Sequence, residues 1–186
     1  MTTDLRPRRG RIFLTGFMGC GKSTIGPILA NSIGYQFSDL DRLIEQRNDK
    51  SVKRLFEEDG ERYFRGEEFA VLEELATRDK MVVALGGGTL AEPAAFESIA
   101  RSGILIYLKV PPEELLKRLQ YKTDRPLLMD ESGNRLPEAA LRERMMALFT
   151  RREPLYERAD IIVFADEQRL GLTVDHLVRM LMPVLK

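Results

Sequence analysis

The feature that most constrains this chain is a glycine-rich segment near its start, GFMGCGKS at residues 16–23. It matches the pattern G-x-x-x-x-G-K-[ST], in which glycines let backbone N–H groups turn toward phosphate oxygens. An apolar run, Ile12-Phe13-Leu14, precedes it, and residues 25–33 place apolar side chains on one helical face after it. A strand, a tight loop and a helix in this order present the positive helix N-terminus to the same anion. The segment therefore predicts nucleotide-phosphate binding, although the motif alone does not separate a kinase from a switch GTPase or a motor.

Within this segment each residue type has a distinct expected role. The amine of Lys22 reaches the β- and γ-phosphates in this motif, and the hydroxyl of Ser23 ligates Mg²⁺. The expected ATP-binding stretch comprises Gly19, Cys20, Gly21, Lys22, Ser23 and Thr24. Cys20 stands at a variable position, so we expect its backbone to bind while its thiol packs or faces solvent.

The rest of the chain alternates short apolar runs with longer amphipathic segments, which predicts an α/β fold with a parallel sheet covered on both faces. Strands are expected at 12–14, 35–37, 81–85, 104–110 and 160–164, and helices over 60–78 and through 174–181, with another starting at Pro111. Pro27 falls inside the helix after the glycine-rich segment, where we expect a mild distortion rather than a break. Residues 1–186 form one expected domain, of which 1–10 are a flexible basic tail.

Charge and composition exclude several classes of protein. Lys plus Arg and Asp plus Glu both number 29, so the chain lacks the basic excess of a nucleic-acid binder. Four arginines cluster near the start, which is typical of a solvated terminus: Arg6, Arg8, Arg9 and Arg11. No apolar run has the length of about eighteen residues that a membrane span needs. The single cysteine excludes an internal disulfide and fits a cytoplasmic protein. We expect a monomer.

Two carboxylates follow the second expected strand, Asp39 and Asp41, one residue apart. Asp39 can lie behind the water ligands of Mg²⁺, and Asp41 can face a hydroxylated substrate. The alternative is that one of them caps the next helix. A GTPase or motor would normally add a separate acidic strand motif and more chain, so this pair favours a small kinase.

Five further motifs follow the glycine-rich segment in a fixed order, and together they indicate a specific family. They are the Asp39 and Asp41 pair, GERYFR at 60–65, the glycines 86–88, RPLL at 125–128 and REPLY at 152–156. Their order and spacing, over roughly residues 11 to 165, resemble those of the shikimate kinases. The resemblance implies a three-layer P-loop kinase fold, similar to that of nucleoside monophosphate kinases, with a five-stranded parallel sheet and a mobile lid. It also implies phosphate transfer from ATP to the 3-hydroxyl of shikimate, a step toward chorismate and the aromatic amino acids.

The same resemblance assigns residues to the substrate. Asp41 looks like the carboxylate that holds the shikimate hydroxyls and takes the 3-hydroxyl proton. Arg65 and Arg152 look like the pair that grips the substrate carboxylate, and Gly87 looks like a backbone donor to a hydroxyl. The substrate-binding region would span residues 34–65.

On the nucleotide side, Arg125 looks like a lid arginine that reaches the phosphates, within a lid at residues 121–136. Arg118 corresponds to an arginine near the adenine in some members. Together with Lys22 and Asp41, Arg125 completes the expected catalytic set, because phosphoryl transfer depends mainly on positioning and charge neutralisation.

The chemistry of the residues agrees with this assignment. A small carboxylate with several hydroxyls calls for planar, bidentate arginine contacts, although any one arginine could be a solvated surface charge. Glu61 and Glu68 could tie down Arg65 or form ordinary helix pairs. Three glycines after a buried strand permit close approach of a ligand to backbone N–H groups, or form a flexible turn.

Two other functions are compatible with the pattern. The first is another small-metabolite kinase of the same fold, acting on gluconate or on a nucleotide. The second is a non-catalytic paralogue that binds nucleotide and regulates a partner, against which the set Lys22, Ser23, Asp41 and Arg125 argues.

Overall fold

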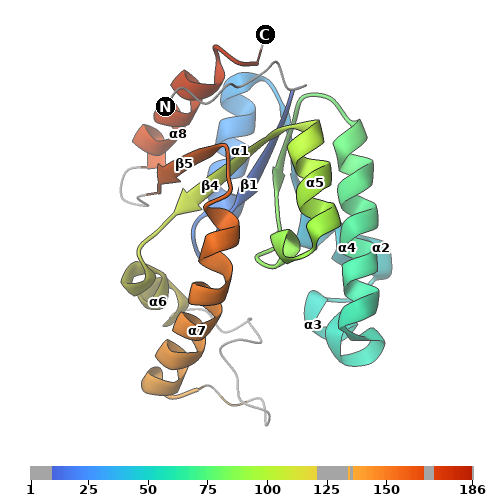
Figure 1. Ribbon diagram of the computed structural model, residues 1–186, viewed down its shortest axis with the longest axis vertical. Coiled ribbons are helices and arrows are strands. Elements are labelled where there is room, and N and C mark those ends of the chain that lie inside the picture. Colours follow the sequence, from blue (N-terminus) through green and yellow to red (C-terminus); the bar gives the residue numbers. More distant parts are fainter. Residues whose placement is uncertain (1–9, 121–133, 135, 166–169, 186) are drawn as a thin grey trace.

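The computed structural model describes residues 10–120, 134, 136–165 and 170–185. Its centre is a five-stranded parallel sheet in the order β2-β3-β1-β4-β5, which confirms the predicted fold class (Figure 1). The strands are β1 Arg11–Thr15, β2 Gln36–Asp39, β3 Met81–Ala84, β4 Ile104–Lys109 and β5 Ile161–Phe164. The side chains of Ile12, Phe13 and Leu14 on the central strand are fully buried, as expected for a strand covered on both faces.

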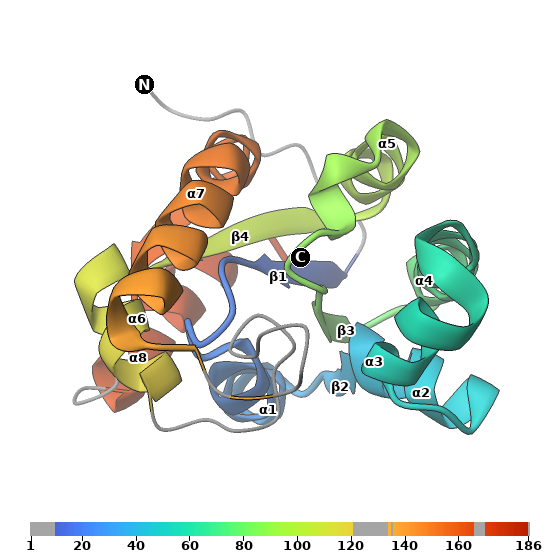
Figure 2. The ribbon, with the colours of Figure 1, turned by 90° about the horizontal axis from the view of Figure 1, so that it is seen from below.

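Helices cover both faces of this sheet (Figure 2). The longer ones are α1 Lys22–Ile33, α2 Leu40–Asn48, α4 Gly60–Thr77, α5 Pro93–Ser102, α6 Pro112–Gln120, α7 Glu138–Tyr156 and α8 Leu170–Leu181. Short segments connect them: α3 Val52–Arg54, the π-helix η1 Leu55–Asp59 and the 3₁₀ turn η2 Thr89–Ala91. Helices α1 and α8 pack together on one face, whereas α5 and α7 lie on the other and α4 packs beside α5.

The register of the strands brings three loops to one edge of the sheet. Leu14 of β1 lies beside Ala84 of β3, and Asp39 of β2 lies beside Ala84 from the other side. Because the strands are parallel, their carboxyl ends meet at one edge, where α/β proteins bind ligands. The glycine-rich loop, the Asp39–Asp41 segment and the glycines 86–88 therefore follow neighbouring strand ends.

The predicted strands are confirmed, as are the helix over 60–78, the helix after Pro111 and the closing helix. Helix α1 runs through Pro27 without a break and ends at Gly34, whose positive φ of 70° suits a residue without a side chain. The sequence analysis did not predict α5 or α7. Helix α7 buries Leu141, Met145 and Phe149 at a spacing of four residues, with charged residues only between the first two.

The prediction that Arg11 belongs to a solvated basic terminus is wrong. Arg11 is only 3% exposed and is the first residue of β1. Its guanidinium donates to the carbonyl oxygens of Ser102 at 2.7 Å and Arg78 at 3.0 Å, and lies 3.4 Å from the carboxylate of Asp79. A buried guanidinium needs such acceptors, and the fold supplies them. Arg6, Arg8 and Arg9 lie outside the described residues.

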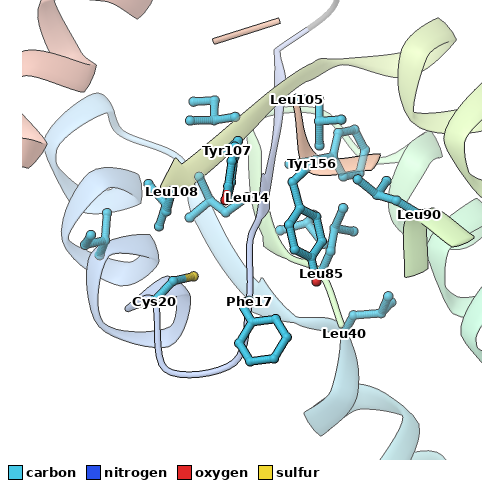
Figure 3. Close-up of a cluster of buried hydrophobic side chains, with 14 of the residues drawn as sticks. Leu14, Phe17, Cys20, Leu40, Leu85, Leu90, Leu105, Tyr107, Leu108 and Tyr156 are labelled. Atoms are coloured by element: carbon cyan, nitrogen blue, oxygen red, sulfur yellow. The ribbon is translucent and has the colours of Figure 1, made fainter. Parts of the chain in front are cut away.

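Buried side chains form one continuous core that reaches the carboxyl edge of the sheet. Figure 3 shows its part beneath the glycine-rich loop, where Phe17 and Cys20 lie close to Tyr107 and Tyr156. Among the helices that the structure describes, none is long and apolar enough to cross a membrane.

Candidate active site

The glycine-rich loop between β1 and α1 adopts a backbone that only glycine tolerates at three positions. Gly16, Gly19 and Gly21 have φ angles of 139°, 82° and 102°. A Cβ atom on Gly16 would lie 2.8 Å from the Leu108 carbonyl oxygen and from Cys20 Sγ, so no side chain fits there. We refer to residues 16–23 as the phosphate loop.

Two side chains at variable positions of the phosphate loop anchor it to the core. The ring of Phe17 packs edge-to-face on Phe149 of α7, with 5.6 Å between centroids. Cys20 is 1% exposed, so its thiol packs and does not face solvent. The loop is therefore rigidly attached, while its backbone remains available.

The amine of Lys22 lies against the loop itself. Its Nζ atom donates to the carbonyl oxygens of Gly16 at 2.7 Å and Phe17 at 3.3 Å, and it is 3.7 Å from Cys20 Sγ. These contacts place one positive charge at the N-terminus of α1, where the helix dipole also attracts an anion.

Ser23 and Asp39 bring the next strand end into the same site. The Ser23 hydroxyl donates to Asp39 Oδ2 at 2.8 Å. The other oxygen of Asp39 accepts from the backbone N–H of Arg42 at 3.4 Å and caps α2. The interpretation of Asp39 as a helix cap is therefore confirmed, and its bond to Ser23 places the same carboxylate beside the residue that is expected to ligate Mg²⁺.

The Ser23 hydroxyl and the Asp39 carboxylate are oxygen ligands of the kind that Mg²⁺ prefers. Mg²⁺ in phosphate-transfer sites uses one or two protein oxygens and completes its shell with water and substrate phosphates. The described residues contain no group of three or more His, Cys, Asp or Glu side chains that could hold a metal ion by protein ligands alone. The Ser23 hydroxyl, with the Asp39 carboxylate 2.8 Å away, therefore suits a phosphate-transfer site in which Mg²⁺ takes its other ligands from water and phosphate.

Side chains from three helices converge on the glycines 86–88 after β3. A Cβ atom on Gly86 would lie 2.8 Å from Asp41 Oδ1, and one on Gly88 would lie 2.8 Å from Arg65 Nη2 and 3.3 Å from Arg152 Nη2. Asp41 comes from α2, Arg65 from α4 and Arg152 from α7. The three predicted substrate residues are thus brought together around the predicted glycine, and all three are half-buried. We call these residues the acceptor cluster: Asp41, Arg65, Gly86–Gly88 and Arg152.

A buried carboxylate orients Arg65. The guanidinium donates to Glu68 Oε2 at 2.5 Å and lies 3.5 Å from Glu61. Glu68 is only 3% exposed, and its other oxygen accepts from the Thr89 hydroxyl at 2.6 Å. Of the two alternatives for these glutamates, Glu68 is a buried partner that ties down Arg65, whereas Glu61 is an exposed i,i+4 pair of the ordinary kind. The Arg65 guanidinium also lies 5.3 Å from the Phe64 ring centroid.

The backbone of the glycines 86–88 has partners of its own. The carbonyl oxygen of Gly87 accepts from the Tyr156 hydroxyl at 2.6 Å, and that of Gly86 lies 3.1 Å from the Thr89 hydroxyl, whose proton goes to Glu68 in the shorter bond. The sequence analysis assigned no role to Thr89 or Tyr156. A signal for Tyr156 was present, because it stands four residues after Arg152 and so shares a helix face with it.

The remaining predicted nucleotide-side residues are only partly covered by the structure. Arg118 on α6 donates to the carbonyl oxygen of Gly19 at 3.1 Å, which places it beside the phosphate loop. Thr24 begins the exposed face of α1. Arg125 lies outside the described residues, as do residues 121–133 and 135 of the predicted lid.

Two buried tyrosines near the site, Tyr107 and Tyr156, have raised pKa values. Burial raises the pKa of Tyr107 and of Tyr156 well above that of a free phenol. Both hydroxyls therefore stay protonated throughout the physiological range, and the Tyr156 hydroxyl remains a donor to Gly87.

Comparison with known proteins agrees with this geometry. The family model described as shikimate kinase matches residues 18–182. A shikimate kinase from Chlorobium chlorochromatii is 52% identical over 168 residues, covering 90% of this chain and 88% of that relative. Among solved structures, a shikimate kinase from Bacteroides thetaiotaomicron matches with a TM-score of 0.85 at 34% identity, covering 93% of this chain and 98% of that one. A shikimate kinase from Acinetobacter baumannii, solved in complex with shikimate, matches with a TM-score of 0.82 at 33% identity, covering 96% of each chain.

Proposed function

The chain belongs to the shikimate kinase family and phosphorylates the 3-hydroxyl of shikimate with ATP as donor, and we propose that its phosphate loop binds the donor while its acceptor cluster binds the acceptor. The observation that carries this division is the convergence of Asp41, Arg65 and Arg152 on the glycines 86–88. This arrangement supplies one carboxylate, two guanidinium groups and exposed backbone within one site.

The acceptor carboxylate binds to the two arginines in this proposal. Shikimate has one carboxylate, and a guanidinium offers parallel N–H donors that match its two oxygens. Both guanidinium groups approach Gly88, at 2.8 and 3.3 Å from the position of an added Cβ. Because the glycines lack side chains, Asp41 and the two guanidinium groups lie close to the backbone, and Gly87 N–H would donate to a hydroxyl of the substrate. The wider substrate-binding region would be residues 34–65.

In this proposal Asp41 binds the hydroxyl that is phosphorylated. Its Oδ1 atom lies 2.8 Å from the position of an added Cβ on Gly86, whereas the guanidinium groups lie near that of Gly88. We assign it to hold the shikimate hydroxyls and to accept the 3-hydroxyl proton as the phosphorus–oxygen bond forms.

Charge neutralisation around the transferred phosphoryl group falls to Lys22 and Arg125. Lys22 already lies against the phosphate loop, and exchange of its bonds to Gly16 and Phe17 for phosphate oxygens would cost little. Arg125 is assigned as the lid arginine and Arg118 as a neighbour of the adenine. Ser23 would ligate Mg²⁺ directly and Asp39 through water, and Mg²⁺ bound with ATP would neutralise charge on the phosphates.

Two attributes of the protein complete the proposal. The chain has equal numbers of acidic and basic residues and a single, buried cysteine. A monomer in the reducing cytoplasm, acting on ATP and shikimate with no nucleic-acid partner, accounts for both.

The test is an ADP-release assay with ATP and Mg²⁺ that compares shikimate, gluconate and AMP as acceptors. We expect turnover with shikimate and negligible turnover with the other two, and a phosphorus NMR spectrum that places the product phosphate on the 3-hydroxyl. The Asp41→Asn variant serves as control and should lose activity by roughly 10²-fold or more, since general-base catalysis contributes that much. Turnover with gluconate or AMP instead would overturn the assignment of the acceptor cluster.

A further inference from the structure

The glycines 86–88 lie at the centre of the acceptor cluster, and glycine is the residue least able to fix its own backbone. A Cβ on Gly86 or Gly88 would lie 2.8 Å from a charged side-chain atom and would displace it. A site that relies on the N–H groups of such a segment needs other groups to fix the peptide planes.

One hydroxyl group fixes the plane of the Gly87–Gly88 peptide. Tyr156 donates to the carbonyl oxygen of Gly87 at 2.6 Å, whereas the single proton of the Thr89 hydroxyl goes to Glu68 in the shorter bond. In a planar trans peptide the N–H of the next residue points opposite to the carbonyl. The bond to Tyr156 therefore sets the direction of Gly88 N–H.

Tyr156 has a second relevant property. It stands one helical turn after Arg152 on α7, and a Cβ on Gly87 would lie 3.2 Å from Arg152 Nη1 and 3.8 Å from Tyr156 Oη. The same helix thus presents both the guanidinium and the group that fixes the neighbouring peptide. Figure 3 shows the Tyr156 ring within the buried cluster, with its hydroxyl directed toward Leu85.

The ring of Tyr156 is itself held in place. Tyr156 is 1% exposed and its ring centroid lies 5.3 Å from that of Tyr107. A buried ring in contact with a second ring has little freedom, so its hydroxyl is a fixed donor.

We propose that Tyr156 is a positioning residue that fixes the Gly87–Gly88 peptide relative to Arg152 and thereby sets the affinity of the site for the acceptor carboxylate and hydroxyls. Tyr156 does not touch the reacting atoms in this account. The inference rests on the proposed function, because it concerns the same acceptor cluster.

The chain offers a matched control. Tyr107 belongs to the same buried ring pair, and its hydroxyl is buried with no hydrogen-bond partner among the described residues. Tyr107→Phe and Tyr156→Phe each remove one hydroxyl from a buried phenol and keep the ring, so their difference reports the contacts of the Tyr156 hydroxyl with Gly87 and Arg152.

The experiment measures KM for shikimate, KM for ATP and the melting temperature in the wild-type protein and both variants. We expect Tyr156→Phe to raise KM for shikimate by roughly three- to ten-fold, the range of one lost hydrogen bond, with KM for ATP unchanged. Tyr107→Phe should leave both constants at wild-type values. Equal changes in both KM values for Tyr156→Phe, or an unchanged KM for shikimate, would overturn the inference.

A second measurement covers the case in which Tyr156→Phe is mainly a stability defect. Combined with Arg152→Lys, Tyr156→Phe should add less than its single effect to KM for shikimate, since both changes act on one arrangement. Full additivity would contradict the coupling to Arg152. Wild-type protein that fails to turn over shikimate would instead overturn the proposed function, so the two failures are distinguishable.

Discussion

The phosphate loop and the acceptor cluster lie at the same edge of the sheet but are built in different ways. The phosphate loop takes all its groups from residues 16–23, and its charged group is supported by the loop's own carbonyl oxygens. The acceptor cluster takes Asp41, Arg65 and Arg152 from three helices, and Arg65 is oriented by a buried carboxylate. A site made from one short segment needs only local geometry, whereas a site made from distant segments depends on the whole fold and on supporting bonds.

The largest expected effect comes from removing the charge of the phosphate loop. Lys22→Met should lower kcat by on the order of 10²- to 10³-fold, the loss that follows removal of one preorganised electrostatic group. KM for shikimate should stay close to wild type, because the acceptor cluster does not contact Lys22 in any bond described above. Steady-state rates at saturating shikimate measure the change in kcat. A rise of similar size in KM for shikimate would show that the phosphate loop and the acceptor cluster are not independent.

A smaller effect is expected from a conservative change in the acceptor cluster. Arg152→Lys keeps the positive charge but removes the planar pair of donors. We expect KM for shikimate to rise by roughly 10- to 100-fold, with KM for ATP unchanged. Titrations of each substrate at saturating levels of the other measure both constants. A KM for ATP that rises in parallel would show that the two regions are not independent.

The smallest expected effect comes from weakening the bond between Glu68 and Arg65, which supports the acceptor cluster. Glu68→Gln keeps the side-chain shape but weakens the bond that orients Arg65. We expect a loss of about 1–3 kcal/mol in the free energy of unfolding, because a buried charge-assisted hydrogen bond is lost, and a rise of a few-fold in KM for shikimate. Urea denaturation and acceptor titration check the two parts. Glu61→Gln is the matched control, since Glu61 is an exposed partner at 3.5 Å and should change neither by a measurable amount.

The difference in construction also explains what the sequence could predict. The phosphate loop was predictable in full, because its residue types and spacing encode its backbone. The roles of Asp41, Arg65 and Arg152 followed only from the order of motifs in a family, since periodicity does not show where distant helices meet. The parallel strands other than β2, whose sequence is QFSD, were predictable from their apolar runs.

Other features required the folded structure. The bond from Tyr156 to the carbonyl oxygen of Gly87 joins residues far apart in sequence. The sequence shows that Tyr156 shares a helix face with Arg152, but not which backbone group its hydroxyl meets. Arg11 looked like one of a solvated cluster, yet it is buried because carbonyl oxygens of Arg78 and Ser102 surround its guanidinium. Asp39 caps α2, one of the two alternatives that the sequence left open, and its contact with Ser23 was not expected from the sequence.

The most direct test of the acceptor cluster compares kcat/KM for shikimate with that for its methyl ester, in wild type and in the Arg65→Lys variant. The account predicts that wild type prefers the free acid by roughly 10²-fold, because the ester cannot form charge-assisted bidentate bonds with the arginines. Arg65→Lys should reduce this preference, while activity with the ester stays near its wild-type value. Equal kcat/KM for acid and ester in the wild-type protein would contradict the claim that Arg65 and Arg152 bind the acceptor carboxylate.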